Sequence, residues 1–237
     1  MPRLRELWIS GFRSLRDIKL QLDGLTVLIG DNGSGKSSIV EGLELLRCTA
    51  HEGYGARVSS GHGGMHQLLE HGADAMSLVA TIDDGGPGPL RYAQRWSRGS
   101  PAPDELLVRW GDPRGGWSET IAERWSDTAQ ATIGERPTPI TRADSMVFVG
   151  AAHHPDMASV AAALAGIDVH LPFQVTASWA SHGQDRKTPR GVSLVEPTTR
   201  LERFGTNLVN AYQALKNDFG VDHWRETLEY VQLGLDL

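Results

Sequence analysis

The stretch LTVLIGDNGSGKSS, residues 25–38, decides how the rest of the chain is interpreted. Residues 30–37 fit the pattern G-x-x-x-x-G-K-[ST] of a phosphate-binding loop. The apolar run at residues 25–29 is typical of a buried strand, and apolar residues between positions 39 and 46 recur at helical spacing. Strand, loop and helix therefore follow one another in the order that the motif requires, which predicts an α/β fold of the P-loop class.

The residue types of this loop match what a nucleoside triphosphate needs. Glycines let the backbone turn sharply and bring its N–H groups against phosphate oxygens. The helix that follows aims its unpaired N–H groups and positive dipole end at the same anion. We expect Lys36 to reach the β- and γ-phosphates and Ser37 to ligate Mg²⁺. The expected nucleotide-binding residues of the loop are Gly30, Asp31, Asn32, Gly33, Ser34, Gly35, Lys36, Ser37 and Ser38, the last as an α-phosphate contact.

Composition restricts the class of protein. The 237 residues are 40% hydrophobic and 22% charged, an ordinary globular composition, and the net charge of −6 argues against a broadly basic surface that coats nucleic acid. The single cysteine, Cys48, excludes an internal disulfide framework and suits a reducing compartment. No apolar run approaches the length of a membrane span, and the amino terminus lacks the pattern of a signal peptide. We therefore expect a cytoplasmic protein without membrane contact.

Two strands are expected before the loop. Residues 4–9 and 18–22 have strand character, a turn lies between them, and Asp23-Gly24 is a turn signal ahead of Leu25. Small kinases and Ras-like GTPases tend to place the phosphate loop after their first strand. The two-strand lead-in therefore points to another branch of the P-loop proteins.

Residues 4–47 resemble the amino-terminal lobe of the RecF/SMC-like branch of ABC-type ATPases, and more narrowly the AAA family ATPases related to RecF and to OLD-type ATPases. Those proteins begin with a strand, an N-F-R-S-like turn, a second strand and then G-x-N-G-x-G-K-S. Here GFRS at residues 11–14 occupies the turn, with Gly where Asn is common.

The resemblance implies an ABC-ATPase-like nucleotide-binding lobe with an antiparallel β arm and carboxy-terminal helices, and ATP and Mg²⁺ as cofactors. It places Arg13 near the nucleotide, although Arg13 could also be a surface arginine beside a hairpin. It further suggests Gln67 as the glutamine that senses Mg²⁺ and the γ-phosphate.

The region after the predicted helix is rich in Gly and His. His62, His66 and His71 suggest a metal site, since two histidines four residues apart lie on one helix face. However, Gly63 and Gly64 disfavour a helix, and no carboxylate or cysteine completes the set. We expect residues 51–72 to form a surface loop.

An acidic pair follows the next predicted strand, at residues 77–82. Asp83-Asp84 after this apolar run superficially resembles a Walker B strand. The sequence continues as Gly-Gly-Pro-Gly-Pro, which is strong turn chemistry. We therefore favour a hairpin, with residues 90–96 as the return strand.

The remainder is interpreted as short strands, a connector and helices. Short strands are expected at residues 106–110 and 116–118, an exposed connector at 126–143, a helix at 157–165, strands at 169–173 and 192–195, and two carboxy-terminal helices, one from the capping box of Thr199 and Glu202 to Phe219 and one from Asp222.

A hydrolysing ABC-type site needs further parts. These are an acidic pair after an apolar strand, a serine-glycine signature from a second subunit, and a switch histidine. After Glu202 neither the pair nor the signature is found, and the only histidine is His223. We therefore expect residues 1–237 to form a single, incomplete ATPase domain, the amino-terminal half of the enzyme. Its expected parts are a phosphate-binding core (1–50), a β-rich arm with loops (51–150) and a segment of strands and helices (151–237).

The main functional hypothesis is ATP binding that drives dimerisation, with hydrolysis in the complete enzyme, in DNA repair, DNA maintenance or phage defence. The expected partners are ATP, a second copy or a protein that supplies the rest of the site, and, by resemblance, DNA. The alternative is a non-hydrolysing nucleotide-binding module that completes or regulates a partner protein. A P-loop kinase or GTPase is disfavoured, because the N-K-x-D guanine motif is absent.

Overall fold

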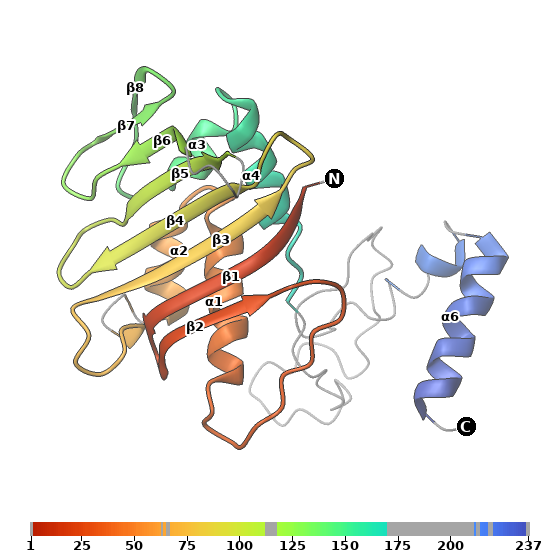
Figure 1. Cartoon of the computed structure of the whole chain (residues 1–237). Helices are drawn as coiled ribbons and strands as arrows, with labels where there is room; N and C mark the ends of the chain where they lie inside the picture. The colour runs from red at the N-terminus through yellow and green to blue at the C-terminus, as the bar shows by residue number, and fades with distance from the viewer. Residues whose placement is uncertain are drawn as a thin grey trace, which may run out of the picture. The chain divides into compact units, whose positions relative to one another are not determined.

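The computed structural model describes residues 2–62, 64, 67–111, 118–169, 211, 214–217 and 220–235. The chain divides into two compact units, Met1–Ile167 and Asp168–Leu237. Among the described residues, the first unit holds a large sheet and four helices, and the second holds α6 (Gly220–Leu235) (Figure 1). None of the described helices is long and apolar enough to cross a membrane.

The sheet of the first unit has eight described strands, and every neighbouring pair is antiparallel. Its order is β2-β1-β3-β4-β5-β6-β7-β8, so the chain forms a hairpin and then a six-strand meander that starts beside β1. The strands are β1 (Arg3–Phe12), β2 (Leu15–Gln21), β3 (Ala75–Asp83), β4 (Leu90–Ser97), β5 (Asp104–Trp110), β6 (Ser118–Arg124), β7 (Gln130–Ile133) and β8 (Arg136–Pro139).

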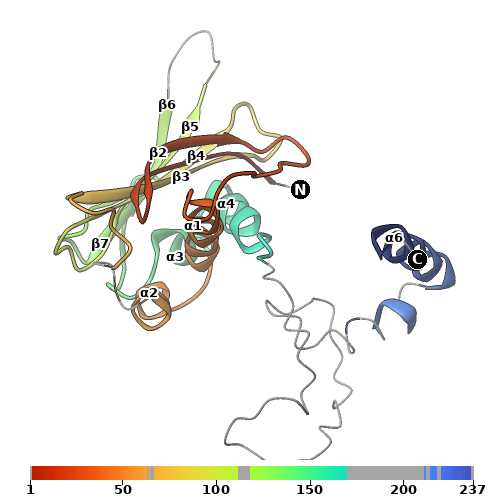
Figure 2. The same ribbon diagram turned by 90° about the horizontal axis from the view of Figure 1, so that it is seen from below.

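In the view along the layers, the described helices of the first unit lie on one face of this sheet (Figure 2). They are α1 (Lys36–Cys48), α2 (Tyr54–His62), α3 (Met146–Gly150) and α4 (Pro155–Ala165). Side chains alternate between the two faces of a sheet along each strand. On the face that the helices cover, Leu78, Tyr92 and Leu107 are buried in one core together with the apolar residues of the helices.

The helix α1 lies unusually close to the sheet at Gly42. A Cβ atom at this position would lie 2.7 Å from Cδ1 of Ile9 on β1. Leu45 and Leu46, one turn further on, are fully buried in the core. A Cβ atom here would force the end of the Ile9 side chain to move, so glycine favours the close packing of the helix that begins at Lys36 on β1.

A buried ion pair connects the sheet to α3. Nη1 of Arg124 donates to Oε2 of Glu105 at 3.0 Å, and both side chains are 0% exposed. Glu105 also accepts from Oη of Tyr92 (2.6 Å), Oγ of Ser145 (2.7 Å) and the backbone N–H of Met146 (2.9 Å). Burial and the neighbouring Glu105 charge raise the pKa of Tyr92 well above its usual value. The carboxylate is therefore satisfied by four donors, and it fixes the start of α3 against β5.

The predicted strand at residues 25–29 is wrong in this structure. These residues are irregular, and Leu25 and Ile29 are each 92% exposed. A strand needs a neighbour to pair with its backbone groups. Among the described strands β2 is the outer strand at this edge and pairs only with β1, so the apolar run has no described neighbour to pair with.

Two segments expected to be loops contain regular structure. The region 51–72 includes α2, because Tyr54 and Val58 lie four residues apart and bury their side chains in the core. The connector expected at 126–143 contains the hairpin β7–β8. Pro137 is tolerated there because β8 is the outer strand of the sheet.

Several predicted elements are confirmed. The hairpin β1–β2, the post-loop helix α1, the hairpin β3–β4 and the helix α4 all occur near their expected positions. The second carboxy-terminal helix is confirmed as α6. The strands expected at 169–173 and 192–195 and most of the preceding helix lie outside the described residues, although residues 211 and 214–217 are helical.

We expect Glu105→Gln to lower the free energy of unfolding by about 3–5 kcal/mol, because it leaves the buried Arg124 charge without a counter-charge. Denaturant unfolding followed by circular dichroism measures this change. The matched control is Lys19→Gln, which removes an exposed pair with Glu6 and should cost at most about 1 kcal/mol. Equal effects of the two substitutions would contradict the role given to Glu105.

Candidate nucleotide-binding site

The phosphate loop has the backbone that its glycines predict. Gly33 and Gly35 adopt left-handed conformations, with φ of 86° and 94°. Gly35 is also the N-cap of α1, and no side chain caps the helix there. The first turn of α1 carries no acidic residue. The first N–H groups of the helix therefore lack a capping side chain and a competing carboxylate, which is the arrangement that binds an anion.

Lys36 folds over this loop. Its Nζ donates to the carbonyl oxygens of Gly30 (2.6 Å) and Asp31 (2.7 Å) and lies 3.2 Å from Oγ of Ser34. All three partners are neutral. A phosphate oxygen in their place would form a charge-assisted and stronger hydrogen bond, so the ammonium group is held where it can exchange partners.

The two serines after Lys36 lie in the first turn of α1. Ser37 is exposed there, and a hydroxyl oxygen suits Mg²⁺ as one ligand among phosphate and water oxygens. Within the described ranges, no group of three His, Cys, Asp or Glu residues could hold a metal ion by itself. Ser38 lies 3.4 Å, Oγ to Oγ, from Ser14 in the turn between β1 and β2.

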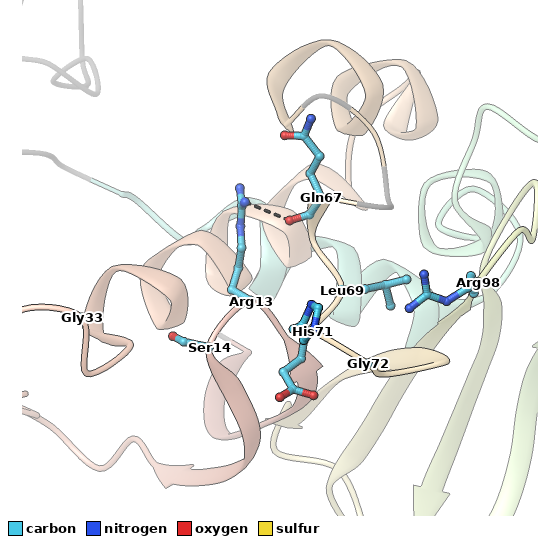
Figure 3. Close-up of a pocket in the computed structure, with 9 residues that line it drawn as sticks. Arg13, Ser14, Gly33, Gln67, Leu69, His71, Gly72 and Arg98 are labelled. Carbon is cyan, nitrogen blue, oxygen red and sulfur yellow. Dashed lines mark hydrogen bonds between the residues drawn. The ribbon is translucent and has the colours of Figure 1, made fainter.

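Arg13 reaches the site indirectly. It has a left-handed backbone, with φ of 52°. Its Nε and Nη2 donate to the two carboxylate oxygens of Glu41 on α1, at 3.0 and 2.7 Å, and its Nη1 donates to the carbonyl oxygen of Gln67 at 2.9 Å (Figure 3). The hydrogen bonds to Glu41 raise the pKa of Arg13. Arg13 thus ties the β1–β2 turn to α1 and to the segment before β3.

Gln67 contributes its backbone carbonyl oxygen, which accepts the hydrogen bond from Arg13. Its side chain is exposed and extends away from Ser14 and Gly33 (Figure 3). The structure therefore does not bring the Gln67 amide together with the phosphate loop, and its proposed role as a Mg²⁺ sensor gains no support from this geometry.

A cavity of about 590 Å³ adjoins the loop (Figure 3). It is lined by Arg13, Ser14, Gly33, Gln67, Leu69, Glu70, His71, Gly72 and Arg98. The sequence pointed to Arg13, Gly33 and Gln67, but not to the other residues. Arg98 follows β4, and no sequence motif marks it as a site residue. It reaches the cavity through tertiary structure, because its backbone N–H donates to the carbonyl oxygen of Asp74 at 2.7 Å.

The acidic pair at the end of β3 serves the hairpin. Asp83 and Asp84 each accept a hydrogen bond from a glycine N–H of the turn, at 3.0 Å. Asp84 also pairs with Arg109 at 2.8 Å, and this contact is the main cause of its lowered pKa. Asp83 pairs with Arg5 at 3.0 Å. The expectation of a hairpin in place of a Walker B strand is confirmed.

We expect Glu41→Gln to weaken Mg²⁺–triphosphate binding by about three- to tenfold, because the bidentate tie that holds α1 loses its charge. Isothermal titration calorimetry measures the affinity, and thermal unfolding measures the stability cost, about 1 kcal/mol for this partly exposed pair.

The matched control is Glu44→Gln, which removes a second described ion pair of α1, also at 2.7 Å, with Arg47 near the end of the helix. It should lower stability without changing affinity. An equal loss of affinity in both variants would mean that Glu41 acts only through general stability of the helix.

Comparison with known proteins supports the interpretation of the amino-terminal part. Residues 3–70 match the family described as AAA ATPase domain. The DNA replication and repair protein RecF of Teredinibacter turnerae is 51% identical over 47 residues, which cover 19% of this chain and 12% of that protein. The RecF of Edwardsiella ictaluri is 36% identical over 84 residues, which cover 35% and 21%.

One solved structure is described as that of the recombination mediator protein RecF-ATP in the RecFOR pathway. The match covers 45% of this chain and 26% of the chain in that structure, with 19% sequence identity and a TM-score of 0.33. The chain thus spans only a small part of the length of the relatives it matches. The matched segment includes the glycine-rich loop that leads into α1. The amino-terminal part of this chain is thus similar to the AAA ATPase domain and to segments of RecF proteins.

Proposed function

We propose that this chain binds ATP with Mg²⁺ through Gly30–Ser38, as the nucleotide lobe of a RecF-like ATPase that acts in DNA repair or maintenance or in phage defence. The observation that carries the proposal is the start of α1, which no side chain caps, with Lys36 held over it by neutral oxygens. ATP is favoured over other triphosphates because the matched relatives are RecF proteins and one related structure is described as RecF-ATP.

The loop residues divide the work of binding. Backbone N–H groups of the loop and of the first turn of α1 donate to the phosphate oxygens, and the ammonium group of Lys36 leaves its carbonyl partners for the β- and γ-phosphates. Ser37 supplies a ligand to Mg²⁺, which neutralises phosphate charge when bound. Ser38 contacts the α-phosphate. Arg13 supports the site by holding α1 through Glu41.

The proposal also assigns the later strands and the carboxy-terminal helix to parts of an ABC-type ATPase lobe. In this proposal the meander from β3 to β8 is the β arm of an ABC-type lobe, and α6 belongs to the carboxy-terminal helical segment. ATP bound between two lobes then acts as a dimerisation switch, and hydrolysis separates them. The additional groups come from a second copy or from a partner that supplies the second half of the site.

The exposed apolar run at residues 25–29 supports a partner next to the loop. Leu25 and Ile29 are each 92% exposed, and the run has the β-branched composition of a strand. Burying such side chains is favourable by roughly 1.5–3 kcal/mol each. We propose that this run becomes a strand when the rest of the ATPase sheet lies beside it.

The alternative is a non-hydrolysing nucleotide-binding module. The acidic pair favours it, because Asp83 and Asp84 are committed to the β3–β4 turn and to Arg5 and Arg109. Turnover of ATP by the chain decides between the two proposals.

We expect Lys36→Ala to weaken ATP–Mg²⁺ binding at least about tenfold, since a hydrogen bond to a charged group contributes about 1.5–3 kcal/mol. Calorimetry measures binding, and release of inorganic phosphate measures turnover in the same samples. Lys19→Ala, an exposed lysine paired with Glu6, is the control and should bind normally. Unchanged affinity in Lys36→Ala would remove the proposed site. Phosphate release that depends on Lys36 would remove the non-hydrolysing alternative.

We expect Leu25→Asp to leave the thermal stability of the chain within about 0.5 kcal/mol of wild type, because the residue is 92% exposed, while reducing self-association or partner capture. Multi-angle light scattering with ATP measures association. Leu45→Asp, in the buried face of α1, is the contrasting variant and should destabilise the fold. A large stability loss in Leu25→Asp would show that the run is buried within the chain itself.

A further inference from the structure

The cavity beside the phosphate loop lies where a nucleoside would continue from the α-phosphate. Ser38 is the proposed α-phosphate contact, and its Oγ lies 3.4 Å from Oγ of Ser14. Ser14 and Gly33 both line the cavity, which extends to residues 67–72 and to Arg98 (Figure 3). The cavity is therefore continuous with the loop on the side of the first turn of α1.

We propose that this cavity holds the base and ribose of the bound nucleotide, and that His71 and Arg98 determine how well the base binds. The inference rests on the proposed function, because it takes the triphosphate to lie on the loop. The volume of about 590 Å³ is within the range of roughly 300–1,000 Å³ that small-molecule sites occupy.

The side chains at the far end of the cavity suit a planar base. Imidazole and guanidinium planes both stack on nucleobases. Nη2 of Arg98 donates to the carbonyl oxygen of Ala73 at 2.7 Å, so one end of its guanidinium is anchored. In Figure 3 Arg98 extends toward Leu69, and His71 lies between Leu69 and Ser14. A flat ligand placed there meets an apolar side chain and two stacking planes.

Glu70 gives the cavity a hydrogen-bond acceptor. Its carboxylate lies 3.5 Å from Nε of Arg16, a long contact with a side chain that is 88% exposed. A carboxylate offers about four acceptor positions, so capacity remains for a ribose hydroxyl. Arg13 takes no comparable part, because its guanidinium already donates to Glu41 and to the carbonyl oxygen of Gln67. It forms a wall of the cavity.

The test compares ATP with inorganic tripolyphosphate, both with Mg²⁺, by calorimetry on the full chain. His71→Ala and Arg98→Lys should each weaken ATP binding about tenfold, the order expected for loss of one base-stacking contact, and leave tripolyphosphate binding unchanged. Lys36→Ala should weaken both ligands. Arg98→Lys keeps the charge, so a change in ATP affinity reports the planar group and not the local potential.

Arg95→Lys is the matched control, since Arg95 lies on β4 and does not line the cavity. It should change neither affinity. Full ATP affinity in both His71→Ala and Arg98→Lys, or equal loss for both ligands, would overturn the cavity assignment while leaving the phosphate loop intact. Failure of the unmodified chain to bind either ligand would overturn the proposed function together with this inference.

Discussion

The packing of α1 against β1 is the contact on which the site depends. Gly42 brings the helix so close to Ile9 that a single Cβ atom would not fit without movement. Since the phosphate loop ends at the first turn of α1, the position of its N–H groups follows from this contact. The tie from Arg13 to Glu41 holds the same helix from its other neighbour, the β1–β2 turn. The loop thus leads into a helix that is packed on the sheet, while residues 30–34 of the loop are exposed.

The rest of the first unit supports that layer through buried polar groups as well as apolar packing. Glu105 and Arg124 are fully buried, and their hydrogen bonds join β5, β6 and the start of α3. Arg109 joins the β3–β4 turn to α4 through Asp84 and Asp156. Such pairs are costly to break one partner at a time. Asp84, one of the two acids that superficially resembled a Walker B pair, takes part in these contacts through Arg109.

The candidate nucleotide site has described residues on one side and an exposed apolar run on the other. The phosphate loop, Lys36 and the cavity with His71 and Arg98 come from the described first unit. The apolar run that leads into the loop is exposed, and the matched RecF proteins are much longer than the segments they share with this chain. The exposed run is the observation on which the proposal of a partner beside the loop rests.

The loop, the helix after it and the turns could be predicted from the amino-acid sequence, because each depends on local chemistry. Glycines at positions 33 and 35 permit left-handed backbone, and Asp83-Asp84-Gly85-Gly86 closes a hairpin through hydrogen bonds within the turn. Contacts between residues far apart in the chain could not be predicted in this way. The exposure of residues 25–29 depends on whether a neighbouring strand is present, and Arg98 reaches the cavity through pairing of β3 with β4. Pairing and packing are long-range interactions, so no local pattern records them.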